Sequence, residues 1–190
     1  MRDENITLEK ILKNLKFLKT KEEKYSYLEN IIEKVNLDHE MKKFLYRIFG
    51  KYCLKIGKLE EAFKAYKEAN YKKGIIKVGN KYIYLERLDE AFKAYKEVNY
   101  KKGIIKVGNK YFEYFRKIKN PIKYNYLNKA FEAYELIKYK KGLIKVGYEY
   151  IELFYKTKDS EYLYKAYEVF KLINYEKGRR KAGIEILKNL

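Results

Sequence analysis

Apolar residues recur every three or four positions along nearly the whole chain, which is the spacing of amphipathic helices. Ile11, Leu15 and Leu18 show it near the N-terminus and predict a helix near residues 6–18. Helix-forming residues dominate, strand-turn-strand patterns are absent, and the only proline is Pro121, so we expect an all-α chain. The same reasoning predicts further helices near residues 21–35, 38–56, 59–70, 72–86, 89–98, 101–117, 121–137, 140–156, 159–173 and 175–189.

Three short segments carry signals for helix ends. Gly57 follows a predicted helix and indicates a C-terminal cap. Asn120-Pro121 has the order of an N-cap followed by proline in the first turn. Asp159 or Ser160 is expected to cap the helix that follows.

The chain repeats itself with a period of 29 residues. Residues 61–82 recur at 90–111 with one change, Ala69 to Val98, and weaker copies of the same pattern continue to residue 186. Because repeated two-helix units stack on their neighbours, this pattern predicts an α-solenoid. We expect one continuous domain, with an N-terminal helical cap over residues 1–43 and, over residues 44–190, a repeat array that ends in a closing helix.

The repeats place a Gly-x2-Tyr motif on the first helix and an Ala-x3-Tyr motif on the second, with Cys53 in place of the first tyrosine in the first copy and Phe170 in place of the second tyrosine in the last copy. In the best copy these residues are Gly79, Tyr82, Ala91 and Tyr95. The small residues are expected to let the paired helices approach closely, and the tyrosines to fill the wedge between them.

This arrangement resembles the tetratricopeptide repeat over roughly residues 44–186. The period is shorter than the family's about 34 residues, and the proline after the second helix is missing, which leaves the turn Asn70-Tyr71. The resemblance implies a right-handed superhelix of ten or eleven helices. It also implies a protein-interaction scaffold whose concave groove is lined by the first helix of each pair.

The charge of the chain is strongly positive and unevenly spread. It carries 45 Lys and Arg against 26 Asp and Glu. Residues 50–120 have a net charge of +11, against +2 for residues 1–49 and +6 for residues 121–190. Abundant Lys and Glu without any Gln also fit a thermophile. Because the surplus lies on the repeats, it favours an anionic partner for the array.

Lysines four residues apart form the clearest candidate site. Lys73, Lys77 and Lys81 share one helix face, with Asn80 beside them. Equivalent positions in the later copies hold Lys102, Lys106, Asn109, Lys110, Lys141, Lys145, Lys177 and Lys181. The resemblance places Lys73, Lys77 and Asn80 on the groove side, where some tetratricopeptide domains hold a terminal carboxylate. The alternative is a solvated face that duplication has multiplied.

The binding partner is predicted from this face. A non-catalytic groove for an acidic peptide or protein segment is the first hypothesis, and RNA or single-stranded DNA is the second. The chain has 23 tyrosines, and aromatic rings between lysines stack bases in single-stranded nucleic acids. Tyrosines also fill wedges between helices, so only Tyr84 and Tyr148 are candidate ligands.

Motifs for catalysis, metals and membranes are missing from the sequence. Gly74-x4-Gly79 is followed by Asn80-Lys81 and lacks the Lys-Ser/Thr pair of a phosphate-binding loop. His39 and Cys53 are the only residues of their kinds, so we expect no disulfide, no metal site, no cofactor and no enzyme activity. No apolar run is long enough to span a bilayer and no signal peptide is recognisable, so we expect a cytoplasmic location.

Overall fold

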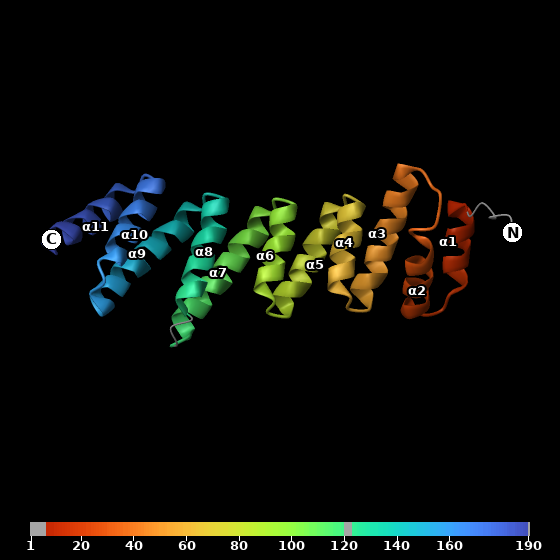
Figure 1. The fold of residues 1–190 in the computed structure, drawn as a ribbon, viewed down its shortest axis with the longest axis horizontal. Helices are drawn as coiled ribbons and strands as arrows, with labels where there is room; N and C mark the ends of the chain where they lie inside the picture. Colours follow the sequence, from red (N-terminus) through yellow and green to blue (C-terminus); the bar gives the residue numbers. More distant parts are fainter. Residues whose placement is uncertain (1–6, 120–122, 190) are drawn as a thin grey trace. The chain divides into compact units, whose positions relative to one another are not determined.

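The computed structural model describes residues 7–119 and 123–189, and these form eleven α-helices without a β-strand (Figure 1). The all-α fold class is therefore confirmed for this part of the chain. The helices are α1 Leu8–Phe17, α2 Lys21–Ile31, α3 His39–Lys55, α4 Leu59–Glu68, α5 Lys72–Tyr84, α6 Leu88–Glu97, α7 Lys101–Lys117, α8 Lys123–Leu136, α9 Lys140–Thr157, α10 Glu161–Leu172 and α11 Glu176–Lys188.

The predicted helix bounds agree with the structure to within two residues except at the end of α2, and the predicted helix start near residue 121 lies outside the described residues. This helix ends at Ile31 rather than near residue 35. Ile32 and Val35 follow it in a turn and are both buried in the cluster that joins α1, α2 and α3. Leu45 of α3 belongs to the same cluster, so the segment after α2 is positioned by packing between helices, which apolar spacing along the chain does not show.

The predicted caps are found where the structure describes them. Gly57 has a positive φ of 84° after α3, as expected of a C-terminal cap. Before α10, Ser160 is the N-cap by position, but the Asp159 carboxylate accepts the hydrogen bond from the Glu161 N–H at 2.9 Å. The predicted Asn120-Pro121 cap lies outside the described residues.

The chain divides into two compact units, the first ending at Asn99 and the second beginning at Tyr100. In the first unit α3 packs on α4 and α5 on α6, and in the second α7 packs on α8 and α9 on α10 (Figure 1). Within each unit, second helices also pack on the first helix that follows them: α4 on α5 in the first unit, and α8 on α9 and α10 on α11 in the second. First helices touch as well, since α3 contacts α5, α7 contacts α9 and α9 contacts α11.

The short turn between pairs is closed by two backbone hydrogen bonds. After α4, Asn70 has a left-handed φ of 46° and its N–H donates to the Lys67 carbonyl at 2.9 Å. The Tyr71 N–H donates to the Tyr66 carbonyl at 2.8 Å, and the rings of Tyr66 and Tyr71 lie 5.5 Å apart. This is a Schellman motif with its apolar contact, and it ends the helix without a proline. Tyr134 and Tyr139 repeat it after α8, with the same distances of 2.8 Å and 5.5 Å.

In α4, α8 and α10 an aromatic ring lies against glycines of the first helices on both sides. A Cβ added to Gly50 would lie 2.8 Å from the Tyr66 ring, and one added to Gly74 would lie 2.5 Å from it. Tyr134 lies in the same way between Gly108 and Gly142, at 2.6 Å and 2.5 Å. The glycines are therefore needed because the rings already occupy the space of a side chain.

Gly79 shows the same relationship and corrects one expectation. Its missing Cβ would lie 2.5 Å from Cε1 of Tyr95, and the nearest atoms around that point all belong to this ring. The space at Gly79 is thus filled by Tyr95 rather than by Ala91. Ala91 is buried as expected, but the close approach of the two helices is a contact between a glycine and a ring.

Candidate anion-binding site

The predicted lysines lie at the surface of the first helices α5, α7, α9 and α11. Only Lys110 is half-buried, and it pairs with Glu113 at 3.7 Å. Nζ of Lys81 lies 4.8 Å from the centre of the Tyr84 ring, and Nζ of Lys181 lies 5.6 Å from that of Tyr148. Within residues 7–119 and 123–189, no carboxylate lies at ion-pair distance from Lys73, Lys77, Lys102, Lys106, Lys141, Lys145 or Lys177. Their charges are available to an anion.

The two predicted asparagines have a structural partner. Asn80 Oδ1 accepts a hydrogen bond from the Tyr95 hydroxyl at 2.8 Å, and Asn109 Oδ1 accepts one from the Tyr134 hydroxyl at 2.8 Å. Burial raises the pKa of Tyr134, so its hydroxyl remains a donor. Each asparagine therefore holds the ring that packs on the preceding glycine, and only its Nδ2 amide is left to donate to a ligand.

A hollow of about 310 Å³ in the first unit brings one predicted lysine together with residues that the sequence analysis missed. It lies between α3, the end of α4 and α5. Its lining consists of Phe44, Arg47, Ile48, Lys51, Tyr66, Tyr71 and Lys77. Lys77 is the member predicted from the sequence.

Three cationic side chains surround this hollow. The guanidinium of Arg47 lies over the Tyr71 ring, with Cζ 4.3 Å from the ring centre, in cation–π geometry. Lys51 comes from the next turn of α3 and Lys77 from α5. No carboxylate of the described chain lies at ion-pair distance from these three side chains. The hollow is thus a positively charged site without an internal counter-ion.

The Tyr66 hydroxyl adds a neutral donor to the hollow. Lys51 stands one repeat length before Asn80 in the sequence. It therefore takes the place of the asparagine that, in the next two helix pairs, accepts a hydrogen bond from the tyrosine hydroxyl. Among the described residues Tyr66 consequently has no hydrogen-bond partner. Burial raises its pKa to about 12, so the hydroxyl is protonated at neutral pH and donates to an anion.

The floor of the hollow is apolar. Phe44 is 43% exposed, and Ile48 is partly buried beside it. An occupant that combines a carboxylate with a neighbouring apolar side chain would satisfy both the charges and this floor. The signal in the sequence was the departure of α3 from the repeat, because Arg47 and Lys51 stand where the next copy has Ile76 and Asn80.

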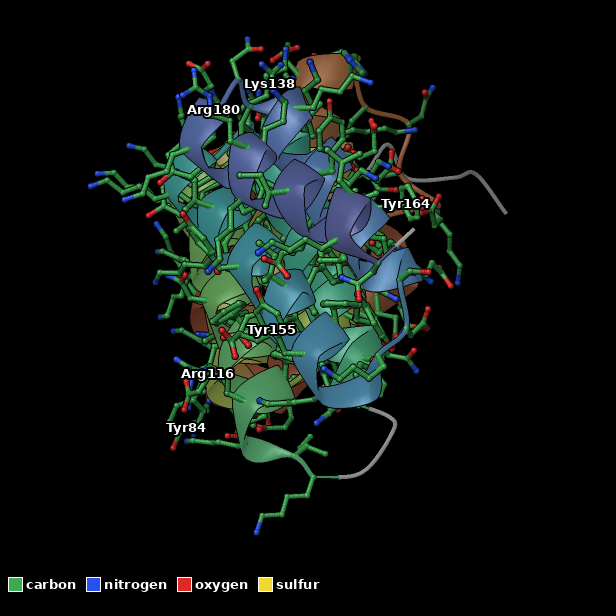
Figure 2. All side chains as sticks on the ribbon, turned by 90° about the vertical axis from the view of Figure 1, so that its left-hand side faces the viewer. Tyr84, Arg116, Lys138, Tyr155, Tyr164 and Arg180 are labelled. Carbon is green, nitrogen blue, oxygen red and sulfur yellow. The ribbon has the colours of Figure 1, made fainter. Side chains whose placement is uncertain are left out.

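Tyr84 and Tyr148, the two tyrosines proposed as ligands, differ in how far their side chains are exposed. Tyr84 is 77% exposed at the end of α5, and its side chain extends away from the ribbon (Figure 2). Tyr148 is half-buried and packs edge-on against Phe170, with ring centres 5.2 Å apart. Its hydroxyl lies 3.4 Å from that of Tyr175. Tyr148 is thus a packing residue, and Tyr84 keeps an exposed ring.

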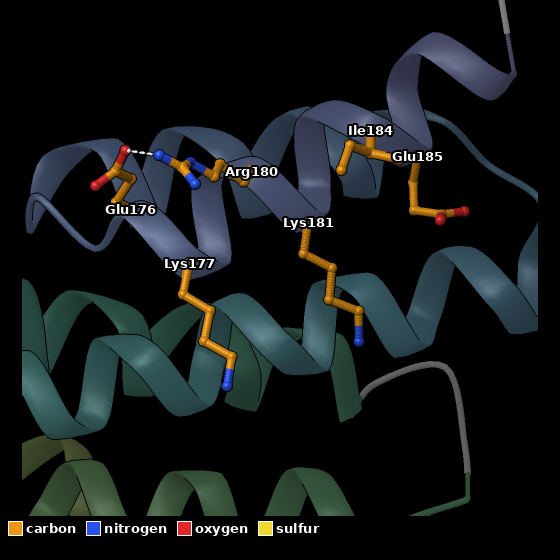
Figure 3. Close-up of a pocket in the computed structure, with 6 residues that line it drawn as sticks. All are labelled: Glu176, Lys177, Arg180, Lys181, Ile184 and Glu185. Carbon is orange, nitrogen blue, oxygen red and sulfur yellow. Dashed lines mark hydrogen bonds and ion pairs between the residues drawn. The ribbon is translucent and has the colours of Figure 1, made fainter.

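In the second unit, Lys177 and Lys181 line a hollow of about 520 Å³ on α11 (Figure 3). Glu176, Arg180 and Ile184 also line it. Arg180 and Glu176 form an ion pair at 2.6 Å. The lysine face and an apolar side chain therefore meet here too.

Residues with intrinsic reactivity do not cluster in the described structure. Cys53 is buried and its pKa is raised to about 12 by burial, so the thiol is un-ionised, as expected of a core residue. His39 is exposed at the start of α3. The described residues contain no group of three His, Cys, Asp or Glu side chains placed to hold a metal ion. None of their helices is both long and apolar enough to cross a membrane.

The chain was also compared with known proteins. No protein-family model matches the chain, and no curated protein matches it.

Proposed function

We propose that this protein is a non-catalytic scaffold of short tetratricopeptide-like repeats that binds an acidic segment of another protein. Three features support the repeat assignment: the packing of helices in successive pairs, the ring held between two glycines, and the Schellman turn that takes the place of the usual proline. The fold alone specifies no ligand, so the functional part rests on the hollow in the first unit.

The observation that carries the function is the set of donors around that hollow. Three positive charges come from Arg47, Lys51 and Lys77. The Tyr66 hydroxyl is a fourth hydrogen-bond donor, because no asparagine accepts from it as Asn80 does from Tyr95. A carboxylate is the anion that suits them, because the fork of an arginine and a neutral hydroxyl both donate well to its two oxygens. Phe44 and Ile48 accommodate an apolar side chain next to it.

In the second unit, lysines of the first helices form a row of their own. Because α7 contacts α9 and α9 contacts α11, Lys106, Lys145 and Lys181 lie on successive neighbouring helices. Further acidic residues of a partner would find unpaired lysines along such a row. Such contacts between charges mainly raise the association rate, and the part of the affinity that they add decreases with salt concentration.

Single-stranded nucleic acid is the second candidate. It is favoured by Tyr84, whose exposed ring lies beside the Lys81 ammonium and offers both a stacking surface and a charge for a phosphate. Of the rings that line the first hollow, Tyr66 and Tyr71 are packed against each other, and Phe44 is 43% exposed against 77% for Tyr84.

The two functions are separated by a binding titration. A fluorescein-labelled peptide of alternating glutamate and leucine and a labelled oligouridylate are each titrated with the protein at several salt concentrations. The variant Lys51→Glu/Lys77→Glu is compared with Lys13→Glu/Lys16→Glu, which makes the same charge change on exposed positions of α1. We expect the hollow variant alone to lose about tenfold or more in peptide affinity.

Equal losses in both variants would contradict a specific site and leave only the effect of net charge. Tighter binding of the oligouridylate, with log affinity falling by about 0.7 per phosphate contact for each unit of log salt, would replace the peptide function by nucleic-acid binding.

A further inference from the structure

One first helix has a glycine that no ring covers. Gly183 of α11 stands five residues after Gly178, as Gly147 stands five residues after Gly142 on α9. A Cβ on Gly147 would lie 2.5 Å from the Phe170 ring of the helix that follows, and the corresponding distance at Gly108 is 2.6 Å. At Gly183 the nearest heavy atom is Cε2 of Tyr167, 3.8 Å away. The place that a ring fills elsewhere is open on α11.

The apolar residues beside Gly183 are uncovered as well. Leu187 is 73% exposed, whereas Ile151, at the same place on α9, is fully buried. Ile184, next to the glycine, is 52% exposed and lines the hollow shown in Figure 3. Together with Gly183 they form a face that matches, position by position, one that the following helix covers on α9.

Charge distinguishes this face from its equivalents. Where α9 has Leu143 and Ile144, α11 has Arg179 and Arg180, and both arginines are exposed. Lys177 and Lys181 extend from the adjacent side of α11 (Figure 3). Arg180 pairs with Glu176 at 2.6 Å, whereas no carboxylate of the described residues lies at ion-pair distance from Arg179. A helix that covers Gly183 would meet these arginines at its border, and an acidic residue there would complement Arg179.

After Gly79, Gly108 and Gly147 the next residue matches the ring that packs on the glycine, whereas Lys51, after Gly50, leaves the Tyr66 hydroxyl without an acceptor among the described residues. Asn80 and Asn109 accept the hydroxyls of Tyr95 and Tyr134, whereas Tyr148, after Gly147, packs edge-on against the Phe170 ring. Ile184 follows Gly183 and has no polar atom in its side chain. A tyrosine placed there would bury a hydroxyl without this partner, so the face suits phenylalanine.

We propose that α11 is a docking surface for an acidic amphipathic helix of a partner protein, which inserts a phenylalanine against Gly183. The helix would pack as α10 packs on α9, with its apolar stripe over Ile184 and Leu187 and its carboxylates beside Arg179 and Arg180. The surface is separate from the hollow on the first unit and does not depend on the function proposed for it.

The test uses the chain's own second helix as a probe. A labelled, helix-stabilised peptide carries residues 161–173 with Lys165→Glu and Lys171→Glu, and is made with phenylalanine, tyrosine or serine at position 170. Fluorescence anisotropy with the full chain is expected to show the phenylalanine peptide binding about tenfold more tightly than the tyrosine peptide, because an unpaired buried hydroxyl is unfavourable.

Two variants of the full chain make the assignment specific. Gly183→Leu fills the open place and is expected to abolish the preference for phenylalanine while the thermal transition is retained, and Gly183→Ala is expected to weaken it less. Ile184→Asn provides the missing acceptor and is expected to shift the preference towards the tyrosine peptide. This gain in binding cannot be produced by unfolding.

Equal affinity for the phenylalanine and serine peptides would overturn the proposal. Unchanged binding in Gly183→Leu would do the same. If sedimentation instead shows a concentration-dependent dimer that Gly183→Leu removes, the occupant is a second copy of this chain and the partner helix is rejected.

Discussion

The ring of Tyr134 occupies the space that a side chain on Gly108 would need, with Cε1 2.6 Å from the position of a Cβ. The hydroxyl of the same ring donates to Asn109, the residue after that glycine. One side chain is thus placed by both volume and a hydrogen bond. This accounts for the recurrence of glycine, asparagine and tyrosine at Gly79 and Gly108, whereas the Tyr66 ring packs against Gly50 without an asparagine.

Replacing Gly108 by alanine is expected to destabilise the protein, although alanine is the better helix former. Its Cβ would overlap the Tyr134 ring, and overpacking of this kind costs about 1–3 kcal/mol. The free energy of unfolding from urea titrations measures the effect. Gly183→Ala is the matched control, because its Cβ meets nothing closer than 3.8 Å. The control is expected to gain about 0.5–1 kcal/mol from helix propensity. Similar effects at the two glycines would rule out the ring contact.

Tyr66 is expected to make folding sensitive to alkaline pH. Its folded-state pKa is raised from 10.0 to about 12, chiefly by burial. The neutral hydroxyl is therefore favoured in the folded state, and its contribution to stability is complete below pH 10 and is lost as the pH rises towards about 12. Phenolate absorbance followed together with helicity measures this loss. Tyr66→Phe should remove one late-titrating phenol and leave stability at neutral pH nearly unchanged, because the hydroxyl has no acceptor. A large loss at neutral pH would show that the hydroxyl has a structural partner.

The left-handed residue after α8 offers a stabilising substitution. Lys138 has a φ of 53°, a conformation that a side chain with a Cβ adopts at a cost of about 1–2 kcal/mol. Lys138→Gly is therefore expected to raise the free energy of unfolding by about 1 kcal/mol. Asn174 holds the same place after α10 with a φ of 50°, and asparagine tolerates this region, so Asn174→Gly should gain less. Thermal denaturation of both variants tests the difference. Equal gains would mean that the residue type at this turn does not matter.

The sequence predicts those features of this protein that depend on interactions between residues close together in the chain. The helices were predictable because apolar spacing, caps and glycines act within a few residues, and the bounds of α7 agree at both ends with those expected from the pattern. The end of α2 was missed because contacts of Ile32 and Val35 with another helix decide it. The lysines lie on the first helices at the spacing that the pattern gives, and all but the half-buried Lys110 are exposed, while their role in binding an anion stays a prediction.

The candidate site needed the tertiary structure. Arg47 and Lys51 lie more than twenty residues from Lys77 in the sequence, and only the packing of α3 on α5 brings them to one hollow. The packing of α6 on α5 decides that Gly79 meets Tyr95 instead of Ala91, and that Asn80 accepts a hydrogen bond from the Tyr95 hydroxyl. Repetition along the chain specified which residues recur and on which helix face. Which of them touch was decided by side-chain volume and hydrogen bonding between helices, which no local pattern encodes.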